Sequence, residues 1–294
     1  MNTQIFKVII LFTLMFVPNS TIAQLTDIAR LEYSFIPQSQ SEDQYTRFRA
    51  LFNYPIELKK GSYFVIGAEY NRVHLKLEEP YPFETDIIDK FHIIDFSMAY
   101  TFKTHDDWRF GVKVYPRIAS TLTQSITWRD FFINGGIYAI KDRLKDESLN
   151  NPWRLILGLT YNSTAGVPFP LPFISYYRIL NEKWSYTLGI PKSNIKLQLN
   201  SKSTFQTFVT FDGFYAHIQD AIVINDELAD HISLSVVVGG LGYEYSFTDH
   251  LAAYIYTGYT FRLNNVLRAE NRDEIYKLDN INAPYLRTGL KFKI

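Results

Sequence analysis

Strict alternation of apolar and polar residues is the feature that most constrains this chain. Residues 94–103 read IDFSMAYTFK, and residues 48–57, 108–114 and 286–294 repeat the pattern. Successive side chains of a β-strand point to opposite faces, whereas a helix would scatter these apolar residues around its circumference. The pattern therefore predicts β-strands with one face in an apolar environment. In the first segment we expect Phe96, Met98, Tyr100 and Phe102 on that face, and Asp95, Ser97 and Thr101 on the other.

The composition indicates that this apolar environment is lipid. Aromatic residues make up 16% of the chain, with 21 Tyr and 23 Phe, yet the mean hydropathy is −0.11. Such a chain fits a transmembrane β-barrel, in which lipid-facing and lumen-facing residues alternate. After residue 23 no uninterrupted apolar run reaches the ~20 residues of a membrane-spanning helix. Cysteine is absent, so stability must come from packing or from closure of the sheet.

Residues 1–23 have the pattern of a cleaved export signal. Lys7 precedes an apolar run over residues 8–17, and the small-residue pattern Thr21-Ile22-Ala23 follows. A charged start, a run of about ten apolar residues and a small-residue exit are typical of a signal peptide. We expect cleavage before Gln24, which leaves residues 24–294 as one domain in the outer membrane of a Gram-negative cell. No cysteine stands at the cleavage point to carry a lipid anchor.

Turn chemistry divides the remainder into fourteen predicted strands. Short connections, such as residues 59–62 and 104–107, alternate with longer ones, such as residues 78–90, 218–231 and 264–282. This matches barrels with short periplasmic turns and longer extracellular loops. The count of fourteen requires a tight turn at residues 191–194, and twelve strands is the alternative. The predicted strands are 29–36, 45–57, 63–77, 91–103, 108–119, 130–142, 153–162, 173–180, 184–190, 195–199, 204–217, 232–247, 251–263 and 283–294.

Tryptophan placement supports this division. Trp108, Trp153 and Trp184 each stand at the first strand position after a predicted periplasmic turn. Amphipathic rings prefer the boundary between membrane and water, so the three predict an aromatic girdle. Tyr63 and Phe205 occupy equivalent positions.

The polar faces of the predicted strands are rich in basic residues. The inward basic set is Arg30, Arg47, Arg49, Lys103, Arg109, Lys113, Arg117, Arg154, Arg178, Arg262, Arg287, Lys291 and Lys293. The inward acidic set is Glu32, Glu57, Glu69, Asp95, Asp212 and Glu244. A basic lumen favours anionic solutes. The alternative is a lumen filled by salt bridges, because a charge in a narrow barrel is tolerated when it is paired or hydrated.

Other chemistry finds little support in the sequence. The six histidines show no paired metal-ligand spacing, and we expect no metal site and no cofactor. No G-x-S-x-G occurs, and Asp212 is expected to be an ion-pair partner rather than a catalytic group. The run Gly239-Gly240-Leu241-Gly242 lies inside a strand where the apolar parity switches, which predicts a bulge or a close backbone approach. Without residues 1–23 the chain has 29 basic and 30 acidic residues, which gives no indication of a nucleic-acid partner.

The chain resembles a family of uncharacterised outer-membrane β-barrel proteins, grouped as a domain of unknown function. The resemblance covers nearly the whole chain after the signal. It is carried by FRALFNYPI at residues 48–56, WRFGV at 108–112, NGG at 134–136 and LGYEY at 241–245. It implies the fold and the location, and it brings no substrate or catalytic residue. Ile294 departs from the terminal aromatic residue usual in such barrels.

Three functions follow from this reading. The first is a channel or transport barrel for small solutes, anionic ones among them, lined by Arg47, Arg49, Arg109, Lys113 and Arg117. The second is a plugged structural or interaction barrel whose acidic loops meet partners or lipopolysaccharide. The third is a membrane hydrolase, which requires a Ser or Asp beside a His at the outer interface. We favour a protein that is not an enzyme, with outer-membrane lipid as its surroundings and its oligomeric state undetermined.

Overall fold

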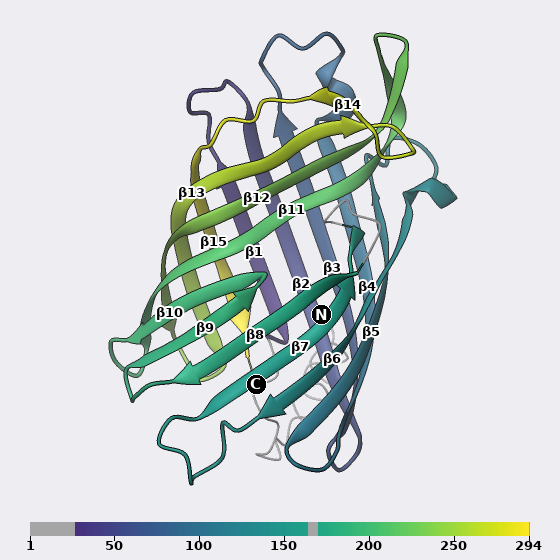
Figure 1. Ribbon diagram of the computed structural model, residues 1–294. Coiled ribbons are helices and arrows are strands. Elements are labelled where there is room, and N and C mark those ends of the chain that lie inside the picture. The colour runs from purple at the N-terminus through teal and green to yellow at the C-terminus, as the bar shows by residue number, and fades with distance from the viewer. Residues whose placement is uncertain (1–26, 164–169, 294) are drawn as a thin grey trace, which may run out of the picture.

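Fourteen antiparallel strands form a closed barrel in the computed structural model, which describes residues 27–163 and 170–293 (Figure 1). The expected signal peptide and Ile294 lie outside the described residues. The barrel strands are β1 Ala29–Ile36, β2 Gln44–Lys59, β3 Ser62–Lys76, β4 Lys90–Lys103, β5 Trp108–Ser120, β6 Phe131–Asp142, β7 Trp153–Tyr161, β8 Leu171–Ile179, β9 Trp184–Ile190, β10 Lys192–Gln198, β11 Ser203–Ile224, β12 Glu227–Ser246, β13 Leu251–Arg268 and β15 Pro284–Phe292. A short strand, β14 Glu274–Lys277, pairs with the end of β13.

The sheet closes because its first and last strands pair. Strand β1 is hydrogen-bonded to β2 on one side and to β15 on the other, and β13 joins β15 to β12. Every barrel strand therefore has a hydrogen-bonded neighbour on both sides over at least part of its length, as a lipid environment demands. The predicted count of fourteen is confirmed. We call the end with the long connections the outer end and the opposite end the periplasmic end, as in other barrels.

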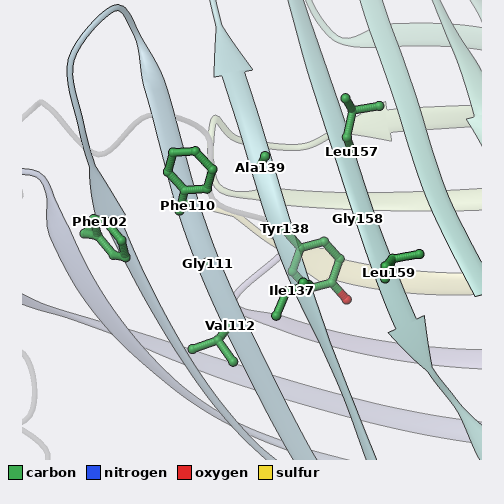
Figure 2. Close-up of a pocket in the computed structure, with 10 residues that line it drawn as sticks. All are labelled: Phe102, Phe110, Gly111, Val112, Ile137, Tyr138, Ala139, Leu157, Gly158 and Leu159. Carbon is green, nitrogen blue, oxygen red and sulfur yellow. The ribbon is translucent and has the colours of Figure 1, made fainter. Parts of the chain in front are cut away.

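The facing predicted for residues 95–102 is confirmed. Met98 is 40% exposed on the outer surface, together with Phe96, Tyr100 and Phe102. Asp95 on the opposite face is buried against Arg117. The outward side chains also form an apolar groove of about 520 Å³ across β5, β6 and β7, shown in Figure 2. It lies where the small Ala139 stands between larger apolar residues, so acyl chains of the membrane can fill it.

Strands β9 and β10 form the shortest hairpin of the barrel wall among the described residues. Each has seven residues, about 23 Å along the strand. The turn predicted over residues 191–194 is tighter than expected, because β10 already begins at Lys192. Lys192 pairs with Thr210, so β11 continues beyond this hairpin without β10 as a neighbour.

Strands β11 and β12 extend beyond the rest of the wall as one long hairpin. Residues 218–231, predicted to be a loop, are mostly strand, and the turn lies at Asn225 and Asp226. Near its outer end β11 pairs with β5 through His217 and Ser120. The pairing is parallel because alternate strands of an antiparallel barrel run in the same direction. Near the outer end of the barrel, β11 is therefore the neighbour of β5, because β7 to β10 end closer to the periplasmic end (Figure 1).

The distribution of apolar residues inverts along the strands, as β3 shows. Near its outer end Val73 and Leu75 face inward and are buried, whereas Arg72, His74 and Lys76 face outward and are exposed. Nearer the periplasmic end, apolar residues such as those of β4 face outward into lipid. Apolar inside and polar outside is the pattern of a water-soluble domain. The outer part of the barrel therefore projects beyond the lipid.

The outer part contains a solid hydrophobic core, which we call the outer core. The rings of Phe91 and Phe214 meet near its centre with centroids 5.5 Å apart, and Phe91 is 0% exposed. Ile88, in the short 3₁₀ helix η1 Thr85–Ile88, is also buried in this core. Further members include Ile36, Tyr45, Val73, Leu75, Ile93, Ala119, Ala216, Leu234 and Val236.

The parity switch in β12 comes from this core. No register shift occurs at Gly239 to Leu241 with either neighbouring strand, so the predicted bulge is wrong there. Apolar residues leave the inner face of β12 where the outer core ends and appear on the outer face where lipid begins. The predicted close backbone approach is found, because a Cβ on Gly240 would lie 2.1 Å from the carbonyl oxygen of Thr257.

Candidate functional site: an ion-pair belt across the lumen

A three-membered ion-pair cluster crosses the barrel interior just below the outer core. Arg47 of β2 donates two hydrogen bonds to the carboxylate of Asp212 of β11, at 2.8 and 2.6 Å. Arg287 of β15 donates to the same carboxylate at 2.6 Å. The side chains of Arg47, Asp212 and Arg287 are 7%, 17% and 13% exposed. Asp212 thus links strands that are not neighbours in the sheet, which favours its predicted role as an ion-pair partner.

Glu32 of β1 extends this cluster toward the periplasmic end. It is 2% exposed and accepts a hydrogen bond of 2.6 Å from the hydroxyl of Tyr254. The guanidinium groups of Arg287 and Arg49 lie 3.6 and 3.9 Å from its carboxylate. A buried carboxylate is tolerated when cations and hydrogen bonds compensate its lost hydration.

Two further ion pairs lie on the inner side of the wall formed by β2 to β5. Arg49 donates to Glu69 at 2.8 Å. Arg117 holds Asp95 through two hydrogen bonds, of 2.6 and 2.8 Å. We name the set Glu32, Arg47, Arg49, Glu69, Asp95, Arg117, Asp212 and Arg287 the ion-pair belt. Alternation places these side chains on the inner faces of their strands, and pairing with opposite charges keeps them there.

Several other predicted lumen residues lie nearer the periplasmic end, whereas Arg262 lies in the outer part of β13 and pairs with Asp279 at 3.5 Å. Glu244 pairs with both Lys291 and Lys293. Arg154 donates to Asp142 at 2.6 Å. Two more predicted positions, Arg109 and Glu57, are joined through Tyr63: the Arg109 guanidinium lies 5.3 Å from the ring centroid, and the Tyr63 hydroxyl donates to Glu57 at 3.3 Å.

Three inner-face lysines have no carboxylate partner among the described residues. Lys113 lies over the ring of Tyr115 at 5.0 Å, and Lys192 lies over Tyr256 at 5.3 Å. Lys196 makes no ion pair within the described part of the chain. The sequence prediction missed Lys192 and Lys196 as lumen residues because it placed Lys192 in a turn. The signal was present in the alternation of residues 192–198, where Ile195 and Leu197 occupy the opposite face.

The belt and the outer core occupy the barrel interior in its outer half. Inner-face residues of the periplasmic half, such as Ser97 and Thr101, keep intermediate exposure. Glu32, Arg47, Asp95 and Arg117 of the belt are buried, as are the outer-core residues, whereas Arg49, Glu69, Asp212 and Arg287 have intermediate exposure.

The predicted girdle residues occupy the outer surface at the periplasmic end. Trp184 is exposed there, and Trp153 packs against Tyr176 with ring centroids 6.0 Å apart. Trp108 stacks on Phe110 at 6.3 Å. Two assignments were wrong: Tyr63 contacts Glu57 and Arg109 on the inner side, and Arg178 pairs with Trp153 on the outer face.

The described residues contain neither a candidate metal site nor a helix that could span a membrane. Across residues 27–163 and 170–293, no group of three or more His, Asp or Glu side chains could hold a metal ion. No helix in the same ranges is long and apolar enough to cross a membrane.

The closed ring, the outward apolar band and the polar interior together define a β-barrel of the outer-membrane type. Residues 19–293 match the family described as "Domain of unknown function (DUF6268)", and the chain belongs to it. A search of curated proteins finds no match.

Solved structures with a similar fold are outer-membrane proteins of several kinds. A NanC porin structure is 12% identical with a TM-score of 0.40, covering 90% of this chain and 100% of that one. A TodX mutant monoaromatic hydrocarbon channel is 10% identical with a TM-score of 0.40, covering 92% and 91%. Outer membrane phospholipase A from Escherichia coli is 11% identical with a TM-score of 0.35, covering 92% and 98%. At these values the likeness adds nothing about substrate or activity.

Proposed function

We propose that this protein is a plugged outer-membrane barrel that acts through binding at its ends, and that it is not an open diffusion pore. The observation that carries the proposal is the burial of the inner faces in the outer half. A water-filled pore would leave those residues exposed to solvent, as polar lumens of porins are. Here they form the outer core, and the ion-pair belt closes the cross-section below it.

Conductance in planar lipid bilayers tests this directly. Folded full-length protein, verified by heat-modifiable migration, is inserted and recorded at low voltage. We expect no steady conductance from the wild type. A steady open level from correctly folded protein would refute the proposal.

A matched variant shows that the assay can detect an opening. Asp212→Ala together with Phe214→Ala removes the centre of the belt and one ring of the outer core from the same strand. We expect leak conductance from this variant and none from Met98→Ala, which changes only the lipid-facing surface. If the opened variant stayed silent while folded, the belt and outer core would not be the closing elements.

A second candidate function, transport of small anions after an opening step, is favoured by the three unpaired lysines. Lys113, Lys192 and Lys196 place positive charge on the inner face without carboxylates to compensate it. Positive lumen charge draws anions in and repels cations, and salt weakens both effects.

The selectivity of the opened variant tests this candidate. Reversal potentials are measured under a salt gradient, with and without Arg109→Glu plus Lys113→Glu in the same background. We expect an anion preference that moves toward cations in the charge-reversed protein. An opened barrel without anion preference would exclude a lumen that selects anions.

A further inference from the structure

A pocket with both polar and apolar lining residues lies at the outer rim. It has a volume of about 350 Å³ and is formed by residues 124–129 and by the extended hairpin of β11 and β12. Its lining includes Ser125, Trp128, Arg129, His217 and Asp230. His217 is also the residue through which β11 pairs with β5, so the pocket lies beside the point where these two strands meet.

One buried carboxylate holds the wall of this pocket in place. Asp130, which ends the 3₁₀ helix η2 Trp128–Asp130, is 0% exposed. It accepts hydrogen bonds from the backbone N–H of Thr127 at 2.7 Å and from Gln219 at 3.0 Å, and it lies 2.8 Å from Nδ1 of His217. Burial acts to raise the pKa of Asp130, but the hydrogen bonds from Thr127 and His217 outweigh it and the pKa is lowered. The carboxylate is therefore ionised and fixes the orientation of the His217 ring.

Further hydrogen bonds attach the loop to β11, so the pocket is preformed. The backbone N–H of Gln124 donates to Gln219 at 2.7 Å, and Thr123 donates to Asp220 at 2.6 Å. A site whose walls are already ordered loses less conformational entropy when a ligand binds.

Several groups remain available to a ligand. Nε2 of His217 and Oδ2 of Asp230 have no hydrogen-bond partner within residues 27–163 and 170–293. Trp128 is 75% exposed, and the Arg129 guanidinium, which also donates a hydrogen bond to Glu270 at 3.4 Å, lies over its ring at 5.8 Å. The hydroxyl of Ser125 completes the set. The pocket thus offers hydrogen-bond donors, hydrogen-bond acceptors and one large aromatic surface.

From this combination we propose that the rim pocket binds a carbohydrate. Sugar hydroxyls both donate and accept hydrogen bonds, which matches the mixture of Arg129, Asp230 and His217. The C–H face of a sugar ring packs on an aromatic ring such as Trp128. The volume lies at the lower end of the range for small-molecule pockets, ~300–1,000 Å³, and suits one or two sugar rings.

The charges and polarity of the pocket disfavour the other ligand classes. Asp230 and Asp130 would repel a strongly anionic ligand, and Arg129 would repel a cation. An apolar ligand would leave the polar groups buried without partners, which is costly. A neutral polar ligand avoids both penalties.

The position of the pocket leaves two sources for the sugar. Ile126, Phe131 and Ile133 are exposed beside it on the outer surface, so the pocket stands near the outer edge of the lipid. The sugar can therefore belong to a glycolipid of the same membrane or to a soluble glycan outside the cell. Both present the same chemistry to the pocket.

Ligand-detected nuclear magnetic resonance of the full-length protein in detergent provides the test. The probes are the methyl glycosides of glucose, galactose and mannose, and a neutral outer-core oligosaccharide released from lipopolysaccharide. We expect saturation transfer to at least one probe, with a Kd on the order of millimolar for a single ring. Trp128→Ala should weaken binding by about tenfold or more, as loss of an aromatic anchor does. Asp230→Asn should weaken it without removing the aromatic surface.

The controls show whether the sugar binds at the rim pocket and whether it comes from a glycolipid or from a soluble glycan. Trp153→Ala, at the opposite end of the barrel, should leave binding unchanged. Binding of the core oligosaccharide points to a membrane glycolipid, and binding of methyl glycosides alone points to a soluble glycan. Absence of binding to all four probes, or equal binding by wild type and Trp128→Ala, overturns the proposal. Because Trp128 is largely exposed, its replacement should not impair folding.

Discussion

Replacing Asp212 with leucine perturbs the ion-pair belt at its most connected residue. The change removes the carboxylate that accepts hydrogen bonds from Arg47 and Arg287 and leaves both guanidinium groups mostly buried. Breaking a buried ion pair by removing one partner costs ~3–5 kcal/mol of unfolding free energy. Glu32 lies 3.6 Å from Arg287 and still compensates that cation. We therefore expect a loss near the lower limit, about 3 kcal/mol.

Urea-induced unfolding in lipid vesicles, followed by heat-modifiable migration, measures this loss. The matched control is Asp142→Leu, which breaks the pair with Arg154 near the periplasmic end, where the side chains are 32% and 21% exposed. Pairs with this exposure contribute about 0–1 kcal/mol.

A double variant separates the charge effect from a packing effect. Arg47→Met with Asp212→Leu removes one cation together with the carboxylate and leaves Arg287 with Glu32. Apolar replacement of a buried pair is often close to neutral, so we expect the double variant to recover at least half of the loss. If Asp212→Leu costs no more than Asp142→Leu, the belt is not a stabilising element and the reasoning is wrong.

Three further predictions address the surface, the rim and the export signal. Met98→Arg should destabilise the barrel by ~2–4 kcal/mol because the side chain faces lipid, whereas Thr101→Arg should cost much less; equal costs in urea titrations would contradict the facing. The pKa of Asp130 is lowered by folding, so its contribution to rim stability is fully present above the usual value of 3.8 and is lost as the pH falls from there through the lowered pKa; Trp128 fluorescence should report this change, and a signal that is flat in acid would contradict it. The mature protein should begin at Gln24, as mass spectrometry of outer-membrane fractions can show, and an uncleaved chain would rule out the signal peptide.

Local alternation was enough to predict the strands because lipid and lumen impose opposite chemistry on successive residues. Met98 and Asp95 could be assigned to their faces from spacing alone. The count of fourteen also followed, since turn residues mark almost every strand end. The limits of β11 were missed because residues 218–224 pair with β12 above the membrane, where no lipid-facing pattern exists to extend the strand.

The candidate site was predictable only in part. Arg47 and Asp212 were assigned to the lumen, but their pairing spans 165 positions in the sequence, and nothing local indicates which cation a carboxylate will meet. Lys192 was missed because a proline before it suggested a turn. The pocket around His217 and Asp230 could not be foreseen, because its walls come from segments about 90 positions apart.

The change of apolar side chains from the inner to the outer face of β12 shows what local sequence could not predict. The switch from Leu234, Val236 and Val238 to Leu241 and Tyr243 was visible in the sequence, and a bulge was a reasonable local explanation. The structure explains it by packing, since Leu234, Val236 and Val238 point into the hydrophobic core, whereas Leu241 and Tyr243 are exposed on the outer face.

The sequence by itself determined a signal-like start, an all-β chain, the strand number and the facing of the membrane-embedded residues. Each of these depends on local periodicity or on neighbouring residues. Only the tertiary structure decided that a hydrophobic core occupies the outer half of the barrel, which charges neutralise one another and where the rim pocket lies. Those properties arise from contacts between distant strands, and closure of the barrel is what brings the strands together.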